Sequence, residues 1–139
     1  RVKVKSKILQ QSNVIVIYGT DQNSNLTKLK KTKAEFIKMS LLDNKINLTE
    51  LMAYLNKLEI NDLWVEAGPD LNGELLKLGL LDELITYTAP YIMGGNANGM
   101  FNTPILDNMK DKIKVCVVDL RSIGEDIRIQ SRVCQNDVD

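Results

Sequence analysis

A chain of 139 residues with 44% hydrophobic content is long enough to bury one core, so a single domain is expected. Its 18 basic and 18 acidic side chains cancel, which leaves no excess positive charge to attract nucleic acids or anionic membranes. Histidine is absent, and this excludes Ser-His and Cys-His nucleophile pairs and histidine-ligated metals. We therefore expect no metal, no nucleic acid and no membrane as partner, and any catalysis must use a bound cofactor.

Two further features concern the environment of the chain. No stretch approaches the roughly 20 apolar residues of a membrane-spanning helix, and no charged-then-apolar leader opens the sequence, so a cytoplasmic protein is expected. Cys116 and Cys134 lie in or near a strand-like region, where unpaired cytosolic thiols usually act as small hydrophobes. The chain begins at Arg1 without a methionine, which is typical of the interior of a longer protein.

The first third of the chain predicts two strands joined by a polar connection. Residues 14–18 are a continuous β-branched run ending at Gly19, the pattern of a strand buried on both faces in a parallel sheet. Residues 21–33 are mostly polar and predict an exposed connection with an irregular helical turn. Residues 36–39 predict a short second strand.

The middle of the chain alternates helix and strand patterns. Asn47 followed by Glu50 predicts the start of a helix, and apolar residues repeat on one helical face as far as Leu58. Residues 60–66 predict a strand by their alternating pattern. A second helix is expected over 71–78.

This second helix should end at Gly79 in a left-handed cap, and a further strand is expected over 84–89. Helix, strand, helix, strand in this order implies right-handed crossovers and parallel pairing. The last two strand patterns, 114–121 and 126–133, predict an antiparallel hairpin that closes the sheet edge.

Residues 66–74, Glu-Ala-Gly-Pro-Asp-Leu-Asn-Gly-Glu, join the predicted strand 60–66 to the second helix. Backbone N–H groups at a helix start favour an anion, and Gly68 lets the main chain come close, so a phosphate or pyrophosphate fits. Alternatively, Gly68 and Pro69 only make a tight turn, with Asp70 supporting the helix start. Spacing alone favours the second interpretation, because the segment lacks both G-x-G-x-x-G and G-K-[ST].

Three segments carry a family resemblance: WVEAGPDLNG at 64–73, LGLLDEL at 78–84 and APYIMGG at 89–95. They resemble the reductase domain of riboflavin biosynthesis, in which a strand ends in Glu-Gly-Gly or Glu-Ala-Gly before a helix. A weaker similarity, DLRSIGED at 119–126, extends to the C-terminal hairpin. The resemblance covers nearly the whole chain, but the family's opening strand and the loop after it have no counterpart before Arg1.

The resemblance implies an α/β, dihydrofolate-reductase-like fold. In this fold a mostly parallel sheet is flanked by helices and carries a C-terminal antiparallel hairpin, here as one reductase domain over residues 1–139. It implies NADPH-dependent reduction of the ribosyl group of 5-amino-6-(5-phosphoribosylamino)uracil, with hydride delivered to C1′ of a ring-opened, imine-like ribose. The product would be the ribitylamino compound. The full-length protein would also contain an N-terminal deaminase domain, although this chain lacks the H-x-E and C-x-x-C zinc ligands of a deaminase.

The same resemblance assigns residues. It places Glu66 on the substrate, whereas the commoner fate of such a residue is a solvated carboxylate at a strand end. Ala67 stands where many family members have a second glycine, which is a mild departure from the family pattern. No side chain is identified as the proton donor. The NADPH diphosphate would lie against Gly68, Pro69, Asp70, Leu71, Asn72, Gly73 and Glu74.

Two alternatives stay open. One is a related NADPH reductase of another pterin or pyrimidine. The other is a truncated, non-catalytic module that keeps only a nucleotide-binding turn or a dimerisation surface, in which case cofactor would bind without product forming. The predicted hairpin offers an edge that could pair with a second subunit, so a homodimer is expected.

Overall fold

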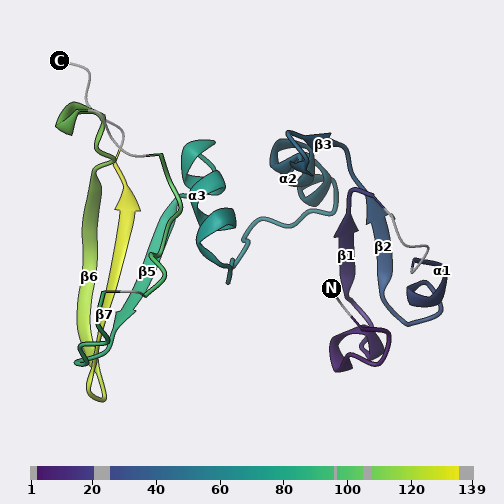
Figure 1. Cartoon of the computed structure of the whole chain (residues 1–139), viewed down its shortest axis with the longest axis horizontal. Coiled ribbons are helices and arrows are strands. Elements are labelled where there is room, and N and C mark those ends of the chain that lie inside the picture. Colours follow the sequence, from purple (N-terminus) through teal and green to yellow (C-terminus); the bar gives the residue numbers. More distant parts are fainter. Residues whose placement is uncertain (1–2, 21–25, 96, 105–107, 135–139) are drawn as a thin grey trace. The chain divides into compact units, whose positions relative to one another are not determined.

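The computed structural model describes residues 3–20, 26–95, 97–104 and 108–134. The chain forms two compact units, Arg1–Trp64 and Val65–Asp139, each with its own helices and strands (Figure 1). The elements of the first unit are η1 (Lys7–Gln10), β1 (Ile15–Tyr18), α1 (Leu26–Leu29), β2 (Glu35–Lys38), β3 (Leu41–Leu42), β4 (Lys45–Ile46) and α2 (Leu48–Lys57). Those of the second unit are α3 (Pro69–Lys77), β5 (Glu83–Thr88), η2 (Met109–Asp111), β6 (Val115–Ile123) and β7 (Asp126–Val133).

The first unit contains a parallel pair of strands. β1 pairs with β2 in parallel from Ile15↔Glu35 to Tyr18↔Lys38, which confirms both expected strands and the expectation that the first lies in a parallel sheet. Their amino ends are tied together because the Lys33 amide donates to the Leu9 carbonyl at 3.2 Å, and Leu9 is fully buried. The expected burial of β1 on both faces is wrong, since all four of its residues are only half-buried. Burial of a strand on both faces requires helices or another sheet packed on each face of its sheet.

Helix α2 starts where the sequence predicts. Asn47 is its N-cap, and the Asn47 side chain accepts a hydrogen bond from the Glu50 amide at 3.1 Å. Glu50 contacts Ser40, accepting from the Ser40 amide at 3.0 Å and also from the Ser40 hydroxyl. The hydrogen bonds from Ser40 hold the pKa of Glu50 below its usual range, so this contact between Ser40 and Glu50 is strongest while the carboxylate is charged.

The small hairpin β3–β4 precedes α2 and was not predicted from the sequence. Leu41 pairs with Ile46 and Leu42 with Lys45, around Asp43 and Asn44. Both turn residues have positive φ, 50° and 62°, as a two-residue type I′ turn requires. The Asp-Asn dipeptide is therefore the signal that could have found this hairpin.

Residues 60–66, which the sequence predicts as a strand, form no strand in the structure. Every one of them is exposed, and Leu63 and Val65 keep 49% and 40% of their surface accessible. Alternating apolar residues indicate a strand only if a neighbouring strand supplies hydrogen bonds, and no described strand pairs with this segment.

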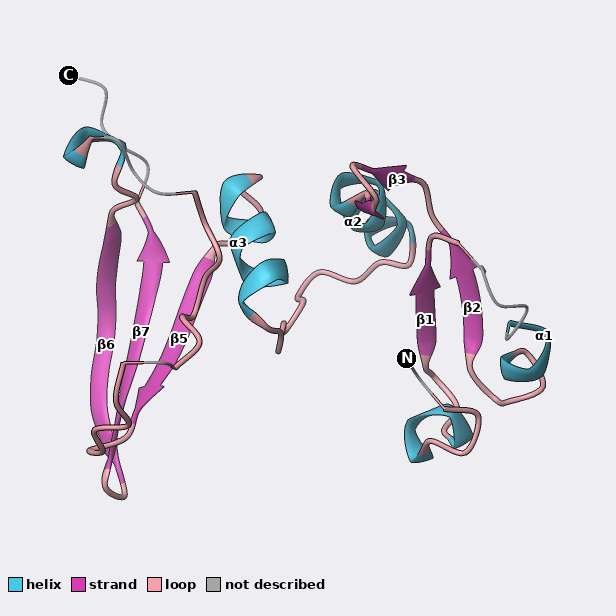
Figure 2. Ribbon diagram, viewed as in Figure 1, coloured by secondary structure: helices cyan, strands magenta, loops and turns pink. Residues whose placement is uncertain are grey.

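The second unit contains a three-stranded antiparallel sheet in the order β5-β7-β6 (Figure 2). The C-terminal hairpin β6–β7 is confirmed, and its turn contains Gly124 at φ 60°. β5 is confirmed as a strand, but it pairs antiparallel with β7, from Glu83↔Arg132 to Thr88↔Ile127. The expected parallel crossover to β5 is absent from the described residues because its other strand, 60–66, does not form. Parallel pairing is thus seen in β1 and β2 alone among the described strands.

One face of this sheet carries a network of charges. Glu83 accepts from Arg132 at 3.0 Å and from Gln130 at 2.9 Å. Asp119 accepts from Arg121 at 2.7 Å and from Arg128 at 2.9 Å, and an irregularity in β6 between Val117 and Asp119 brings Asp119 onto this face. The arginine partners lower the pKa of both carboxylates, and Asp119 raises the pKa of Arg121.

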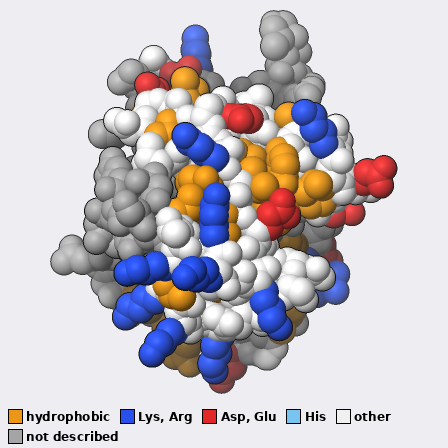
Figure 3. Space-filling model, turned by 90° about the vertical axis from the view of Figure 1, so that its right-hand side faces the viewer, with side chains coloured by type: hydrophobic (Ala, Val, Ile, Leu, Met, Phe, Trp, Pro, Cys, Tyr) orange, Lys and Arg blue, Asp and Glu red, His pale blue; other side chains and the backbone are white. Residues whose placement is uncertain are grey.

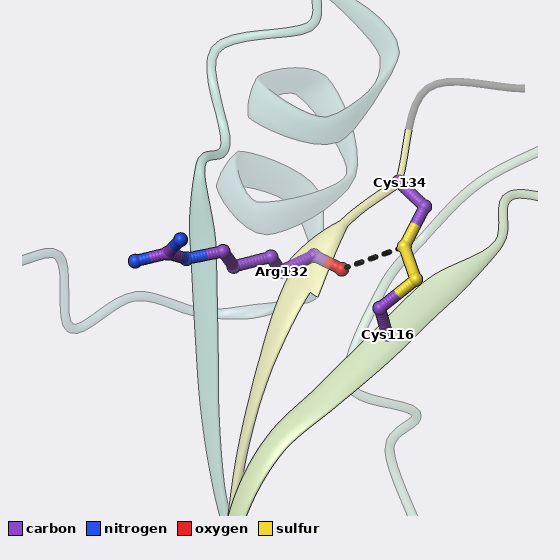
Figure 4. Close-up of a disulfide and its surroundings, with 3 residues drawn as sticks. All are labelled: Cys116, Arg132 and Cys134. Carbon is purple, nitrogen blue, oxygen red and sulfur yellow. Dashed lines mark hydrogen bonds between the residues drawn. A yellow bond between two sulfur atoms is a disulfide. The ribbon is translucent and has the colours of Figure 1, made fainter.

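The expectation of two unpaired cysteines is wrong. Cys116 and Cys134 are joined by a disulfide, with 6.0 Å between their Cα atoms and a sequence separation of 18 (Figure 4). Cys116 lies opposite Arg132 in the strand register, so Cys134 is its diagonal neighbour two residues further on. This separation is within the usual range for a disulfide, and the bridge fastens the open end of the hairpin.

Charge is divided unequally between the two units. The first holds eleven basic and six acidic residues, and the second seven basic and twelve acidic. Residues 3–20 and 26–34 contain seven lysines and no carboxylate, and all seven lysines are exposed. Figure 3 shows Lys and Arg side chains gathered over one surface. A zero net charge therefore conceals a basic and an acidic half.

Candidate cofactor site at the start of helix α3

The turn that leads into α3 is open. Glu66, Ala67 and Gly68 are all exposed, and Gly68 has φ −82° and ψ 173°, an extended conformation that any residue adopts. A Cβ built on Gly68 would meet no atom within 4 Å. Backbone strain and packing therefore do not require glycine here, and the space beside Gly68 is free for a ligand.

The helix itself begins in a way that leaves its amino end accessible. Gly68 is the N-cap and makes no side-chain capping hydrogen bond, and Pro69 at the first helical position has no N–H. The first helical hydrogen bond runs from the Asn72 amide to the Gly68 carbonyl at 3.1 Å. The tight turn with Pro69 first and Asp70 behind it is thus the local structure. The same turn presents backbone N–H groups at the positive end of the helix dipole.

A loop from further along the chain packs on this helical turn. The Asn72 side chain donates to the Met100 carbonyl at 3.1 Å and to the Ala67 carbonyl at 3.4 Å. The Asn102 amide donates to the Pro69 carbonyl at 2.9 Å, and the Asn102 side chain donates to Asp70 Oδ1 at 2.7 Å. Together these bonds hold residues 100–102 against the first turn of α3.

Gly73 is the residue that permits this close packing. It is buried, and a Cβ at this position would lie 2.2 Å from the Asn102 carbonyl oxygen. Gly73 therefore makes room for the loop, a structural role that the sequence did not indicate. On the same helix, the Leu75 side chain is also buried, whereas Leu71 keeps 40% of its surface accessible.

The predicted site residues thus divide by position. Gly68, Pro69, Asp70 and Leu71 surround the open amino end of α3, Asn72 and Gly73 join the helix to the loop, and Glu74 forms an ion pair with Lys77 at 3.8 Å. Glu66 precedes the turn on the exposed segment. Sequence reasoning missed Asn102, because its contact with Asp70 spans 32 positions and no local pattern indicates it.

Other kinds of site receive no support within the described part of the chain. No group of three or more acidic or cysteine side chains there could hold a metal ion. No described helix is long and apolar enough to cross a membrane.

Comparison with known proteins decides the family. A family model described as the RibD C-terminal domain matches residues 1–129. The chain belongs to the RibD C-terminal domain family. The family that the sequence motifs resemble is thereby confirmed, and the mixed helices and strands seen here agree with an α/β fold.

Relatives of this RibD C-terminal domain have names from one pathway. The riboflavin biosynthesis protein RibD of Escherichia coli (strain K12) is 43% identical over 82 residues, covering 59% of this chain and 22% of that protein. The 5-amino-6-(5-phosphoribosylamino)uracil reductase of Buchnera aphidicola subsp. Acyrthosiphon pisum (strain APS) is 37% identical over 87 residues, covering 63% of this chain and 42% of that protein. The chain spans less than half the length of each of these relatives.

A solved structure gives the same result. Acinetobacter baumannii RibD, form 2, superposes with a TM-score of 0.78 and 27% sequence identity, over 96% of this chain and 35% of that one. The structural similarity to this protein therefore extends along almost the whole chain.

Proposed function

We propose that this RibD C-terminal domain binds NADPH and reduces 5-amino-6-(5-phosphoribosylamino)uracil to its ribitylamino product in riboflavin biosynthesis. The family match over residues 1–129 carries the proposal, and a relative that is itself named as this reductase supports it. When bound, NADPH would supply the hydride that reduces the imine-like C1′ carbon of the ring-opened ribose.

The residues at the start of α3 fit the diphosphate of this cofactor. Gly68 leaves space for a ligand next to the main chain, and the helix end offers backbone donors and partial positive charge. The main chain of the turn and helix start from Gly68 through Glu74 would bind and orient the cofactor, and Glu66, just ahead of the turn, would contact the substrate. Orientation is the contribution that such a site makes to hydride transfer.

We propose in addition that the active fold is a dihydrofolate-reductase-like, mostly parallel sheet in one reductase domain over residues 1–139. This fold requires residues 60–66 to hydrogen-bond as a strand, which hydrogen exchange would detect as protection of their amides. The exposed edge of β6 would pair two subunits in a homodimer. The full-length protein would be cytoplasmic and would also contain an N-terminal deaminase domain.

The first test is NADPH binding by titration calorimetry, with the wild type compared with Gly68→Val. The variant should fold, because a side chain there meets nothing, but it should bind at least tenfold more weakly because its methyl groups would occupy the diphosphate space. Gly95→Val is the matched control: its Cβ position is equally open, so it should bind like the wild type. A folded wild type that binds no NADPH would contradict the proposal.

A second candidate is a nucleotide-binding module without turnover. The exposed, non-strand conformation of residues 60–66, which end at Glu66, favours this alternative. Single-turnover measurement of NADPH oxidation with the phosphoribosylamino-pyrimidine substrate separates the two candidates. Binding without oxidation identifies the module, and stoichiometric oxidation identifies the reductase.

A further inference from the structure

Asp70 brings a carboxylate to the amino end of α3, the end proposed to bind the cofactor's diphosphate. It lies on the first helical turn, where backbone N–H groups and the helix dipole attract negative charge. A carboxylate in this place is itself attracted to those groups, and it would repel an incoming phosphate. The amino end of α3 can therefore bind a phosphate in the presence of Asp70 only if the Asp70 carboxylate is kept away from the helix N–H groups.

Asn102 provides this restraint. Its side-chain Nδ2 donates to Asp70 Oδ1 at 2.7 Å, a short hydrogen bond to a charged acceptor. The position of Asn102 is fixed independently of Asp70, because its own amide donates to the Pro69 carbonyl at 2.9 Å and its carbonyl lies against Gly73. The donor is thus anchored by main-chain contacts, and the carboxylate is drawn toward it.

Asn72 fixes the same loop from a second point. Its side chain bridges the Met100 carbonyl, at 3.1 Å, and the Ala67 carbonyl, at 3.4 Å. The loop therefore cannot slide along the helix without breaking bonds at both Met100 and Asn102. A restraint on a carboxylate is effective only when its donor is held in this way.

We propose that Asn102 is a positioning residue that holds the Asp70 carboxylate away from the amino end of α3 and so keeps that end open for the cofactor's diphosphate. The inference rests on the proposed function. Asn102 acts through Asp70 and need not touch the cofactor. Without its amide, the carboxylate is free to turn toward the helix N–H groups and to compete with phosphate.

The test compares NADPH affinity in four proteins: wild type, Asn102→Ala, Asp70→Asn and the double variant. Asn102→Ala should weaken binding about tenfold at low salt, and less at high salt, because the added penalty is repulsion between like charges. Asp70→Asn should bind at least as tightly as the wild type. The double variant should return to within about twofold of Asp70→Asn, because the charge that Asn102 restrains is gone.

A purely structural role for Asn102 gives a different pattern. The double variant would then stay as weak as Asn102→Ala, and that result would overturn the proposal, as would an Asn102→Ala variant with unchanged affinity. If Asn102→Ala does not fold, Asp70→Asn alone decides, because weaker binding would mean that the carboxylate contacts the cofactor. Asn56→Ala, an exposed asparagine in α2, is the matched control and should bind like the wild type.

The same four proteins titrated with inorganic pyrophosphate separate this inference from the reductase assignment. A wild type that binds pyrophosphate but not NADPH contradicts the proposed function, while the ranking of the variants still tests Asn102. A wild type that binds neither ligand overturns the role of Asn102 as well.

Discussion

Glu59 and Gly79 occupy the same position after helices α2 and α3, both in the left-handed region with φ of 59° and 66°. At each position two hydrogen bonds close the last helical turn. After α2, the Glu59 amide donates to the Asn56 carbonyl and the Ile60 amide donates to the Leu55 carbonyl. Left-handed backbone suits glycine and costs other residues about 1 kcal/mol. We expect Glu59→Gly to stabilise the protein by roughly 0.5–1 kcal/mol, measured as a higher urea midpoint.

The reciprocal change is its control. Gly79→Ala should lower the free energy of unfolding by about 1 kcal/mol, and with it the urea midpoint, because the same conformation then acquires a Cβ. A Glu59→Gly protein less stable than the wild type would show that the Glu59 side chain contributes more than its backbone strain costs.

A second prediction concerns the close contact of α3 with the loop at residues 100–102. Gly73→Ala should lower stability by roughly 1–3 kcal/mol, since the added methyl group must displace the Asn102 carbonyl. Thermal denaturation measures the loss. Gly68→Ala on the same helix, where a Cβ meets nothing, should cost less. Equal losses at the two positions would contradict the packing role given to Gly73.

A third prediction concerns the disulfide. Reducing the bridge between Cys116 and Cys134 should destabilise the second unit by roughly 3 kcal/mol, the chain-entropy value for a closed loop of this size. Denaturation with and without reductant gives the difference. The variant with serine at both positions should not respond to reductant. Two free thiols in the untreated protein under denaturing conditions would show that the bridge is not formed.

The fourth prediction is a loss of stability in acid. Arg132 and Gln130 lower the pKa of Glu83. A carboxylate with a lowered folded-state pKa stabilises the fold above its unfolded pKa, and this contribution disappears as the pH falls through the folded pKa. The melting temperature should therefore be steady above about pH 5 and decrease below it.

Glu83→Gln tests the origin of this decrease. The variant should lose part of the pH dependence while the wild type keeps it, and the effect should be small because the ion pair with Arg132 is solvent-exposed. An identical pH profile in both proteins would assign the acid effect to other groups, of which Glu50 and Asp119 also have lowered pKa values.

Local signals made much of the fold predictable. Asn47 at a helix start and Gly79 at a helix end act within a few residues, so the sequence contains the whole cause. The same holds for the hairpin turn at Gly124. Residues 60–66 show the limit, because alternation predicts a strand whose formation depends on a partner elsewhere in the chain.

The candidate site was predictable in part for the same reason. The Gly68-Pro69 turn is visible in the sequence, but the restraint on Asp70 depends on Asn102, 32 positions away. The disulfide also depends on strand register, which brings Cys134 diagonal to Cys116 and which spacing in the sequence does not reveal.

The unequal division of charge between the two units has a consequence for how the protein behaves in solution. With eleven basic and six acidic residues in one unit and seven and twelve in the other, one unit is basic and the other acidic although the net charge is zero. Resins of either sign should retain it at neutral pH and low salt. Cleavage in the exposed segment 60–66, followed by denaturation, would give one basic and one acidic fragment, which isoelectric focusing would separate.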